Sequence, residues 1–265
     1  MKRTLYWLPL TMLLVWLATA LLSPLLTLHP YQMQLPEILA APDSHHWFGF
    51  DDLGRPVFDR LILGARTSLL VAFSVMSVTL VIGCTIGVFS AWSGGWIDSA
   101  VMRICDVFLA FPGILLAISM AAVLGPGIEN VIIALSVVGW VGFARLARAQ
   151  TLQVQQREHV MAARALGTSS TRIVLQHLLP LIVAPIIVEA TFTLSGLIIA
   201  EAGLSFLGLG VQAPEPSWGS MIRDGASYLL VAPHLVIFTG AALLSLVLAV
   251  NLLGDQLRDH LDVKN

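Results

Sequence analysis

Long apolar runs separated by short polar segments dominate the pattern of this sequence. The runs extend over residues 4–28, 67–97, 107–128, from about 130 into the 140s, 181–209 and 226–253. Most of them reach the roughly 20 residues that a helix needs to cross the hydrocarbon core of a bilayer. The fourth run is shorter, but an arginine such as Arg145 near a helix end can place its charged head in the interface. The pattern therefore predicts six membrane-spanning helices.

The polar segments divide the chain into four parts. Residues 1–28 form an N-terminal transmembrane helix, and the run continues too far past Ala18-Thr19-Ala20 for a cleaved signal peptide. Residues 29–66 form an external, periplasmic segment rich in proline and glycine. Residues 67–254 form a five-helix core that contains a cytoplasmic loop at 150–180. Residues 255–265 are expected to form a cytoplasmic tail.

Composition and charge agree with a multi-pass membrane protein in contact with lipid. Hydrophobic residues make up 57% of the chain and charged residues 11%, which excludes a soluble domain of ordinary composition. The net charge of -2 excludes a strongly basic nucleic-acid-binding protein. Assigning all 14 lysines and arginines to a side under six spans gives ten inside and four outside. Because positive residues favour the cytoplasm, both termini are predicted to be cytoplasmic.

The longest polar segment between apolar runs, Glu158 to Pro180, reads as helix, break, helix. Val160, Ala163 and Leu166 share one helical face, and Gly167 can adopt the left-handed conformation that ends a helix. A serine or threonine at 168–170 can cap the next helix. Because small alanines let another protein approach closely, we interpret this segment as a docking surface.

This segment resembles the EAA loop of ABC importer permeases, and the surrounding residues resemble the peptide/nickel permease family. The match consists of Ala162, Ala163, Gly167, Leu179 and Pro180 at the spacings of the motif. This chain departs from that motif at Met161, where many members of the broader superfamily carry glutamate. The earlier Glu158 could supply a carboxylate nearby.

Three other stretches are similar to the same family and extend the resemblance over most of the chain. Residues 46–55, HWFGFDDLGR, resemble its external segment. Residues 201–211, EAGLSFLGLGV, followed by PSWG at 216–219, resemble its fifth helix and the external turn after it. Residues 251–262, NLLGDQLRDHLD, resemble its C-terminal signature. Four such stretches in the same order are a specific signal.

The resemblance implies an all-α integral membrane protein with six transmembrane helices in the type I ABC importer (MetI-like) permease fold of the bacterial inner membrane. It implies a related second permease chain in a heterodimer, two cytoplasmic ATP-binding subunits, and a periplasmic or lipid-anchored solute-binding protein. The chain lacks the GxxxxGK[ST] sequence that cradles phosphates, so it is expected to be no enzyme and to bind no cofactor, with ATP and Mg on the partner subunits. The residues expected to couple the chain to the ATPase are Glu158, Met161, Ala162, Ala163, Leu166, Gly167, Leu179 and Pro180.

Several alternatives remain open at the level of sequence. The expected cargo is short peptides, narrowly ahead of nickel or a metal chelate. A membrane metalloenzyme would use His45, His46, Asp51 and Asp52 as an external metal centre, and a stand-alone channel would need no ATPase. Glu189 and Glu201 lie in an apolar run, and they either contact substrate or make a structural pair.

Overall fold

The chain is built from helices in the computed structural model, which describes residues 2–262 and contains no strand in that range. Three short turns of other helical types, η1 (Ser23–Leu25), η2 (Leu35–Glu37) and the π-helical η3 (Val174–Leu178), accompany the α-helices. The α-helices are α1 (Lys2–Leu22), α2 (Val57–Ser93), α3 (Gly95–Leu109), α4 (Gly113–Leu124), α5 (Ile128–Val154), α6 (Glu158–Ala165), α7 (Ser170–Ile173), α8 (Leu179–Phe206), α9 (Trp218–Ala226) and α10 (His234–Asp262).

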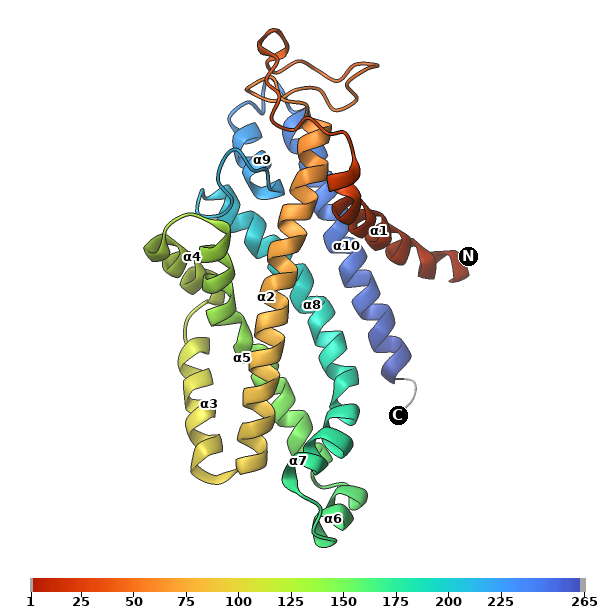
Figure 1. Ribbon diagram of the computed structural model, residues 1–265, viewed down its shortest axis with the longest axis vertical. Coiled ribbons are helices and arrows are strands. Elements are labelled where there is room, and N and C mark those ends of the chain that lie inside the picture. Colours follow the sequence, from red (N-terminus) through yellow and green to blue (C-terminus); the bar gives the residue numbers. More distant parts are fainter. Residues whose placement is uncertain (1, 263–265) are drawn as a thin grey trace.

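Helices α2, α5, α8 and α10 run roughly along one axis, α1 crosses it obliquely, and the two ends of the molecule differ (Figure 1). The short helix α6 lies at one end, which we call the α6 end. Residues 26–56, which contain little regular structure, cover the opposite end together with α9, and we call this the loop end. Helix α1 packs against α10, and there the Trp16 indole N–H donates to the Ser245 hydroxyl at 2.9 Å.

Five helical segments are long and apolar enough to cross a membrane, and a bent pair supplies a sixth. The pair is α3 with α4, which meet at 82°. Pro112 explains the bend, because its ring disfavours helical geometry at Phe111 and because it has no N–H to continue the hydrogen-bond ladder. The prediction of six spans is confirmed with this pair counted as one span. The expectation of an unbroken third helix is wrong.

Helix α2 begins at Val57, ten residues before the uncharged run at 67–97 in which its span was predicted. The predicted external segment 29–66 therefore includes the first part of a helix. The charged residues in this segment gave the wrong start for the helix. Arg60 is only 4% exposed and lies 3.2 Å from a carboxylate oxygen of Asp51. A paired charge does not end a helix as an unpaired charge beside lipid would.

The last apolar run was predicted to be one span beginning near residue 226, but the structure places two helices in this region. Helix α9 ends at Ala226, and α10 begins at His234 after a turn. The predicted external turn at PSWG is the start of α9, where Ser217 and Ser220 form a reciprocal capping box. The N-cap hydroxyl and the hydroxyl three residues later each satisfy a backbone N–H that would otherwise be unpaired.

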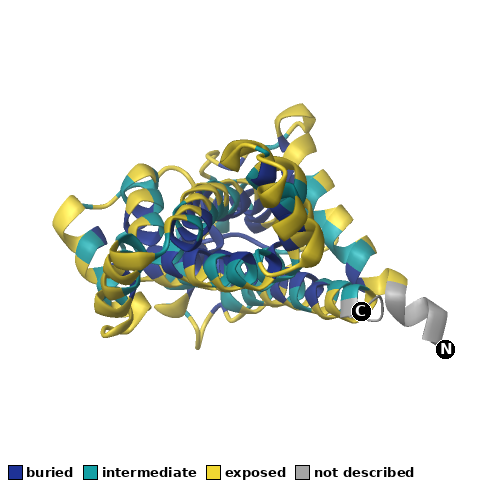
Figure 2. Ribbon diagram, turned by 90° about the horizontal axis from the view of Figure 1, so that it is seen from below, coloured by how far each residue is buried: buried dark blue, intermediate teal, exposed yellow. Residues whose placement is uncertain are grey.

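The interior of the bundle is held by close contact between α2 and α5. A Cβ atom added at Gly83 would lie 2.4 Å from the Trp140 carbonyl oxygen, and one added at Gly87 would lie 2.2 Å from that of Ala144. Only glycine allows two helix backbones to approach this closely. Figure 2 shows the buried residues concentrated on the inner sides of the helices, with the exposed residues outside them. Helices α2 and α5 thus form a tightly packed unit.

Candidate functional site

Helix α6 ends in a specific backbone motif at Gly167. The N–H of Thr168 donates to the Ala163 carbonyl at 3.1 Å, and the N–H of Gly167 donates to the Arg164 carbonyl at 3.1 Å. These two bonds, with Gly167 at φ +79, form a Schellman motif. The predicted helix, break, helix is therefore present, and Gly167 is the break. Ser169 precedes α7 without making a side-chain cap hydrogen bond, so the predicted hydroxyl cap is absent there.

The two sides of α6 have different surroundings. Val160 is 1% exposed and packs in an apolar cluster with residues from α2, α5, α7 and α8. Ala163 is half-buried against the same cluster. On the opposite side Met161 is 53% exposed and Leu166 is 85% exposed. An apolar side chain this exposed at a helix surface is typical of a contact surface for another molecule when its neighbours are also apolar.

Two further contacts fix α6 to the long helices. The Arg164 guanidinium lies 4.6 Å from the centre of the Trp92 ring at the end of α2, which is a cation–π distance. Just before α6, the side-chain amide of Gln155 donates to the Ala91 carbonyl at 3.1 Å. Both contacts join this segment to α2.

The last two predicted coupling residues are not on α6. Leu179 is half-buried and Pro180 is exposed, and both begin α8. They follow η3, the π-helical turn Val174–Leu178. Pro180 has no N–H for the Gln176 carbonyl, and its ring would clash with that carbonyl in a regular α-helix. The wider π turn relieves this clash, so Leu179 and Pro180 shape the return of the chain to the bundle.

An ion pair with an added hydrogen bond, which sequence spacing did not predict, joins α2, α3 and α5. The Arg148 guanidinium donates twice to the Asp98 carboxylate, from Nε and Nη2, each at 2.6 Å. The Ser90 hydroxyl donates to the same carboxylate at 2.7 Å. A second, longer ion pair joins Asp106 of α3 to Arg145 of α5 at 3.8 Å. Fifty residues separate Asp98 from Arg148, so no local pattern could reveal this bidentate pair.

Glu201 of α8 is completely buried beside serine hydroxyls. The Ser205 hydroxyl donates to one carboxyl oxygen at 2.7 Å, and the backbone N–H of Val211 donates to Ser205 at 3.3 Å. The other carboxyl oxygen has no partner among the described residues. This position joins the end of α8 to the turn before α9. The geometry therefore favours the structural alternative for Glu201 over a place on a substrate pathway.

Glu189 lies on a different side of α8 and is half-buried. No described residue is within ion-pair or hydrogen-bond distance of its carboxylate. Gly196 and Gly203 follow it along the same helical stripe, and a Cβ added at either would meet no atom within 4 Å. A carboxylate within a membrane-spanning helix needs a polar environment. That environment must lie on the side of α8 that carries Glu189, Gly196 and Gly203, which we call the open side of α8.

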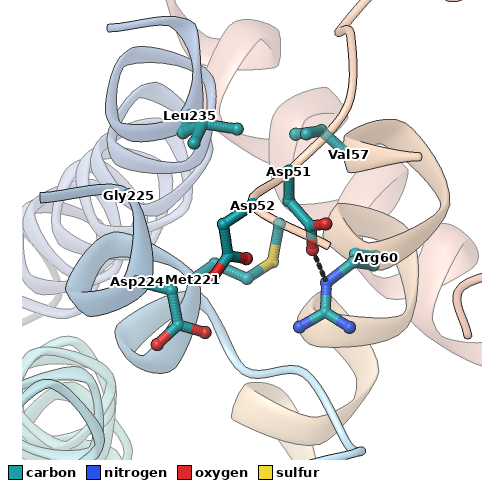
Figure 3. Close-up of a pocket in the computed structure, with 8 residues that line it drawn as sticks. All are labelled: Asp51, Asp52, Val57, Arg60, Met221, Asp224, Gly225 and Leu235. Atoms are coloured by element: carbon teal, nitrogen blue, oxygen red, sulfur yellow. Dashed lines mark ion pairs between the residues drawn. The ribbon is translucent and has the colours of Figure 1, made fainter. Parts of the chain in front are cut away.

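At the loop end, a compact ion network joins residues 51–60 to one another beside α9, and Figure 3 shows its Asp51–Arg60 pair. The Arg55 Nε donates to the Asp51 carboxylate at 2.7 Å, and Arg60 lies 3.2 Å from the same oxygen. Asp52 and Asp224 border a cavity of about 20 Å³ beside this network. One oxygen of Asp52 is buried there without a hydrogen-bond partner. The network stabilises the path of the chain into α2.

Burial raises the pKa of Asp52 above its ordinary value, and the neighbouring Asp51 carboxylate raises it further. A raised pKa means that stability is greatest at low pH and is lost as the pH rises through the pKa of the folded state. We therefore expect Asp52→Asn to raise the melting temperature at pH 7 in detergent and to weaken its dependence on pH. This substitution removes only a long ion pair, because the Arg55 Nη2 lies 3.5 Å from the Asp52 carboxylate.

Asp43→Asn is the comparison for this measurement. Backbone N–H groups of His46 and His45 lower the pKa of the exposed Asp43 carboxyl, which is the opposite direction. Its replacement should leave the melting temperature unchanged or lower at pH 7. A decrease in melting temperature for Asp52→Asn would contradict the conclusion that burial of the ionised Asp52 carboxylate destabilises the fold.

The histidines considered for a metal centre take structural positions in the loop end. The backbone N–H groups of His45 and His46 donate to Asp43, and the His46 ring lies 4.5 Å from that of Phe50. Asp51 is engaged by arginines, as described above. In the part of the chain that the structure describes, no three histidine, cysteine or carboxylate side chains are placed to hold a metal ion.

Comparison with known proteins identifies the family. The family described as binding-protein-dependent transport system inner membrane component matches residues 83–264. The dipeptide transport system permease protein DppC of Alkalihalophilus pseudofirmus is 44% identical over 92% of this chain and 81% of its own length. The glutathione transport system permease protein GsiD of Pectobacterium atrosepticum is 44% identical over 84% of this chain and 74% of its own.

The fold is likewise shared with a solved structure. A chain of the MetNI methionine ABC transporter, in an inward facing conformation, superposes with a TM-score of 0.63 and 23% sequence identity. The match covers 77% of this chain and 97% of the other. The predicted type I, MetI-like permease fold is thereby confirmed. From its sequence relatives and its fold, this chain belongs to the family of binding-protein-dependent transport system inner membrane components.

Proposed function

We propose that this permease subunit forms half of the pathway through which an ATP-driven importer moves short peptides across the bacterial inner membrane. The observation that supports peptides as the cargo is the 44% identity, over 92% of this chain, to a permease named for dipeptide transport. A second relative is named for glutathione transport, and glutathione is itself a tripeptide. Both names indicate small, peptide-bonded cargo.

The proposed complex contains a second related permease chain, two cytoplasmic ATP-binding subunits and a solute-binding protein that delivers the cargo. ATP and Mg are bound by the ATP-binding subunits. Support comes from the exposed apolar side of α6, which a contact with another protein would cover. The α6 end then faces the cytoplasm, the loop end faces outward, and both termini are cytoplasmic, in agreement with the ten-to-four charge bias.

Coupling follows from how α6 is held. Closure of the ATP-binding subunits would move α6, and the contacts of Val160 and of Arg164 with Trp92 would pass that movement to the membrane helices. No bond is made or broken by this chain in the proposed cycle. The cycle is a rigid-body rearrangement that alternately exposes the pathway to the two sides of the membrane.

The open side of α8 is the proposed wall of the pathway. Glu189 would be solvated by water in the pathway rather than by lipid, which resolves the lack of a described partner for its carboxylate. Gly196 and Gly203 would widen the passage next to it. A carboxylate in this position would favour cargo that carries a protonated amino terminus.

The test is uptake of a labelled dipeptide by proteoliposomes that contain the complete complex, ATP inside and the solute-binding protein outside. We expect ATP-dependent accumulation that unlabelled di- and tripeptides inhibit and that a nickel chelate does not. Glu189→Gln should reduce uptake of a free dipeptide more than that of its N-acetylated form. Accumulation inhibited by the chelate alone would contradict the peptide proposal, and equal loss for both peptides would contradict the role of Glu189.

A further inference from the structure

The second half of α8 has buried polar side chains on the side that faces the rest of the bundle. Glu201, Ser205 and Ser195 on this side are each no more than 5% exposed. The Ser205 hydroxyl donates to the Glu201 carboxyl group at 2.7 Å, and the Ser195 hydroxyl lies 2.9 Å from the side-chain oxygen of Asn251 in α10. Polar contacts in a buried site make the local structure rigid. They therefore fix this side of α8 at two levels along the helix.

Three helices meet at the Glu201 carboxyl group. Ser205 belongs to α8 itself, while Ser68 of α2 and Ser217 at the N-cap of α9 also face the carboxyl group. Both of these serines are completely buried. The Ser68 hydroxyl accepts the Trp218 backbone N–H at 3.3 Å, which joins α2 to the first residue of α9. The carboxyl group thus lies at the junction of α2, α8 and α9.

The junction is packed too tightly for α8 to turn freely. Figure 1 shows α9 beside the last turns of α8. A Cβ atom added at Gly219 of α9 would collide with the Ala202 carbonyl oxygen, and one added at Gly210 would collide with the Ser205 hydroxyl. Such close contacts between backbones require glycine. A rotation of α8 would have to disturb α9 as well.

The open side of α8 lies across the helix from Glu201. At 3.6 residues per turn, Gly196 and Gly203 are about 140° and about 160° around the helix axis from Glu201. Both glycines are exposed, and a Cβ added at either would meet no atom within 4 Å. The contacts that fix the Glu201 side therefore also determine the direction in which the open side faces.

We infer that Glu201 is a positioning residue that sets the rotation of α8 about its own axis. Its carboxyl group, held by Ser205 and enclosed by α2 and α9, keeps Gly196 and Gly203 turned away from the bundle and toward the pathway. This inference rests on the proposed function, because it takes the open side of α8 as the wall of the pathway. It gives Glu201 a role in transport that requires no contact with the cargo.

Two substitutions separate hydrogen bonding by Glu201 from the space that its side chain fills. Glu201→Leu keeps a side chain of similar size but leaves the Ser205 hydroxyl and its serine neighbours in an apolar enclosure. Glu201→Gln keeps an oxygen that accepts from Ser205, and its amide N–H groups replace the carboxyl oxygen that has no partner among the described residues. We therefore expect α8 to turn in Glu201→Leu and to keep its orientation in Glu201→Gln.

The rotation is measured by labelling the assembled complex in nanodiscs with a charged, water-soluble maleimide, after Cys84→Ser and Cys105→Ala have removed the native thiols. Gly196→Cys reports on the open side, and Leu194→Cys reports on the opposite side, where Leu194 is 6% exposed. Because thiol labelling follows exposure, Glu201→Leu should slow it about fivefold in Gly196→Cys and speed it about fivefold in Leu194→Cys. Glu201→Gln should keep both rates within about twofold of their starting values.

Val75→Ala is the control for lost stability. Val75 of α2 is completely buried among apolar side chains, so alanine leaves a cavity but removes no polar contact. It should lower the melting temperature of the complex and leave the ratio of the two labelling rates unchanged. If Glu201→Leu prevents assembly, Ser205→Ala takes its place, with an expected change of about twofold in the same direction.

Failure of the inference and failure of the proposed function give different results. If Gly196→Cys is not labelled while Glu201 is intact, the proposed wall of the pathway is wrong, and the inference falls with it. If Gly196→Cys is labelled but neither Glu201→Leu nor Ser205→Ala changes the ratio, the wall stands and the positioning role of Glu201 is overturned. An equal change in Val75→Ala, or a change in Glu201→Gln as large as that in Glu201→Leu, also overturns it.

Discussion

Replacing Gly167 with valine should reduce ATP-driven peptide uptake at least tenfold while the protein still inserts into the membrane. Gly167 has φ +79, and a Cβ added there would meet no atom within 4 Å. The cost is therefore one of backbone conformation and not of crowding. The left-handed conformation costs an ordinary residue about 1–2 kcal/mol, and it is a genuine outlier for a β-branched residue. Valine should relax toward negative φ and break the two bonds that fix the end of α6.

Gly167→Asn is the matched comparison, because asparagine adopts the left-handed conformation more readily than other non-glycine residues. We expect uptake by this variant to stay within about threefold of wild type, since a strain of up to about 0.6 kcal/mol corresponds to that ratio. Uptake is measured in proteoliposomes, with membrane insertion checked by purification yield. If valine supported normal uptake, the end of α6 would not need its motif and the coupling role of the segment would fail.

Gly87→Ala should lower the melting temperature of the purified chain in detergent by roughly 5–10 °C, from a loss of about 2–3 kcal/mol. The new Cβ would lie 2.2 Å from the backbone oxygen of Ala144. A backbone atom within a packed helix cannot rotate away as a flexible side chain could. Helices α2 and α5 must therefore separate locally, which weakens their interface on both sides of the contact.

Gly142→Ala is the same substitution within α5 and should change the melting temperature in the opposite direction. Gly142 also lies within α5, but a Cβ added there would meet no atom within 4 Å. Alanine is favoured over glycine in a helix interior by about 0.5–1 kcal/mol, so this variant should melt slightly higher than the wild type. Equal melting temperatures for the two variants would mean that α2 and α5 are not in close contact at Gly87.

The sequence was informative where local chemistry decides the structure. Long uncharged runs located the spans, because a bilayer accepts few other segments. The glycine at position 167 located the end of α6, because few residues other than glycine occupy that conformation without strain. The prediction that Val160, Ala163 and Leu166 share one face of α6 is wrong at Leu166, which is 85% exposed while Val160 is 1% exposed. Each step of three residues falls about 60° short of a full helical turn, so Leu166 lies about 120° away from Val160. Both the membrane fold and the candidate coupling helix were therefore predictable in outline.

Features that depend on distant residues could not be predicted in the same way. The start of α2 was missed because the charge of Arg60 looked incompatible with a buried helix, and its partner Asp51 became visible only in the structure. The pair of Asp98 with Arg148 and the serine neighbours of Glu201 likewise join separate helices. The bend at Pro112 was in principle readable, since the missing N–H of proline is a local signal.

The two routes by which α6 is joined to the membrane differ in stiffness. On one side is α2, whose 37 residues contain no proline and extend about 55 Å, well beyond the roughly 30 Å of the hydrocarbon core. On the other side are the π turn η3 and then α8, with Pro185 in its interior. In the proposed cycle, a force applied at α6 would meet a straight, proline-free helix in α2, which leads to the ion network at the loop end. The same force would bend the route through η3 and α8 more readily, because the π turn and Pro185 interrupt its regular hydrogen bonding.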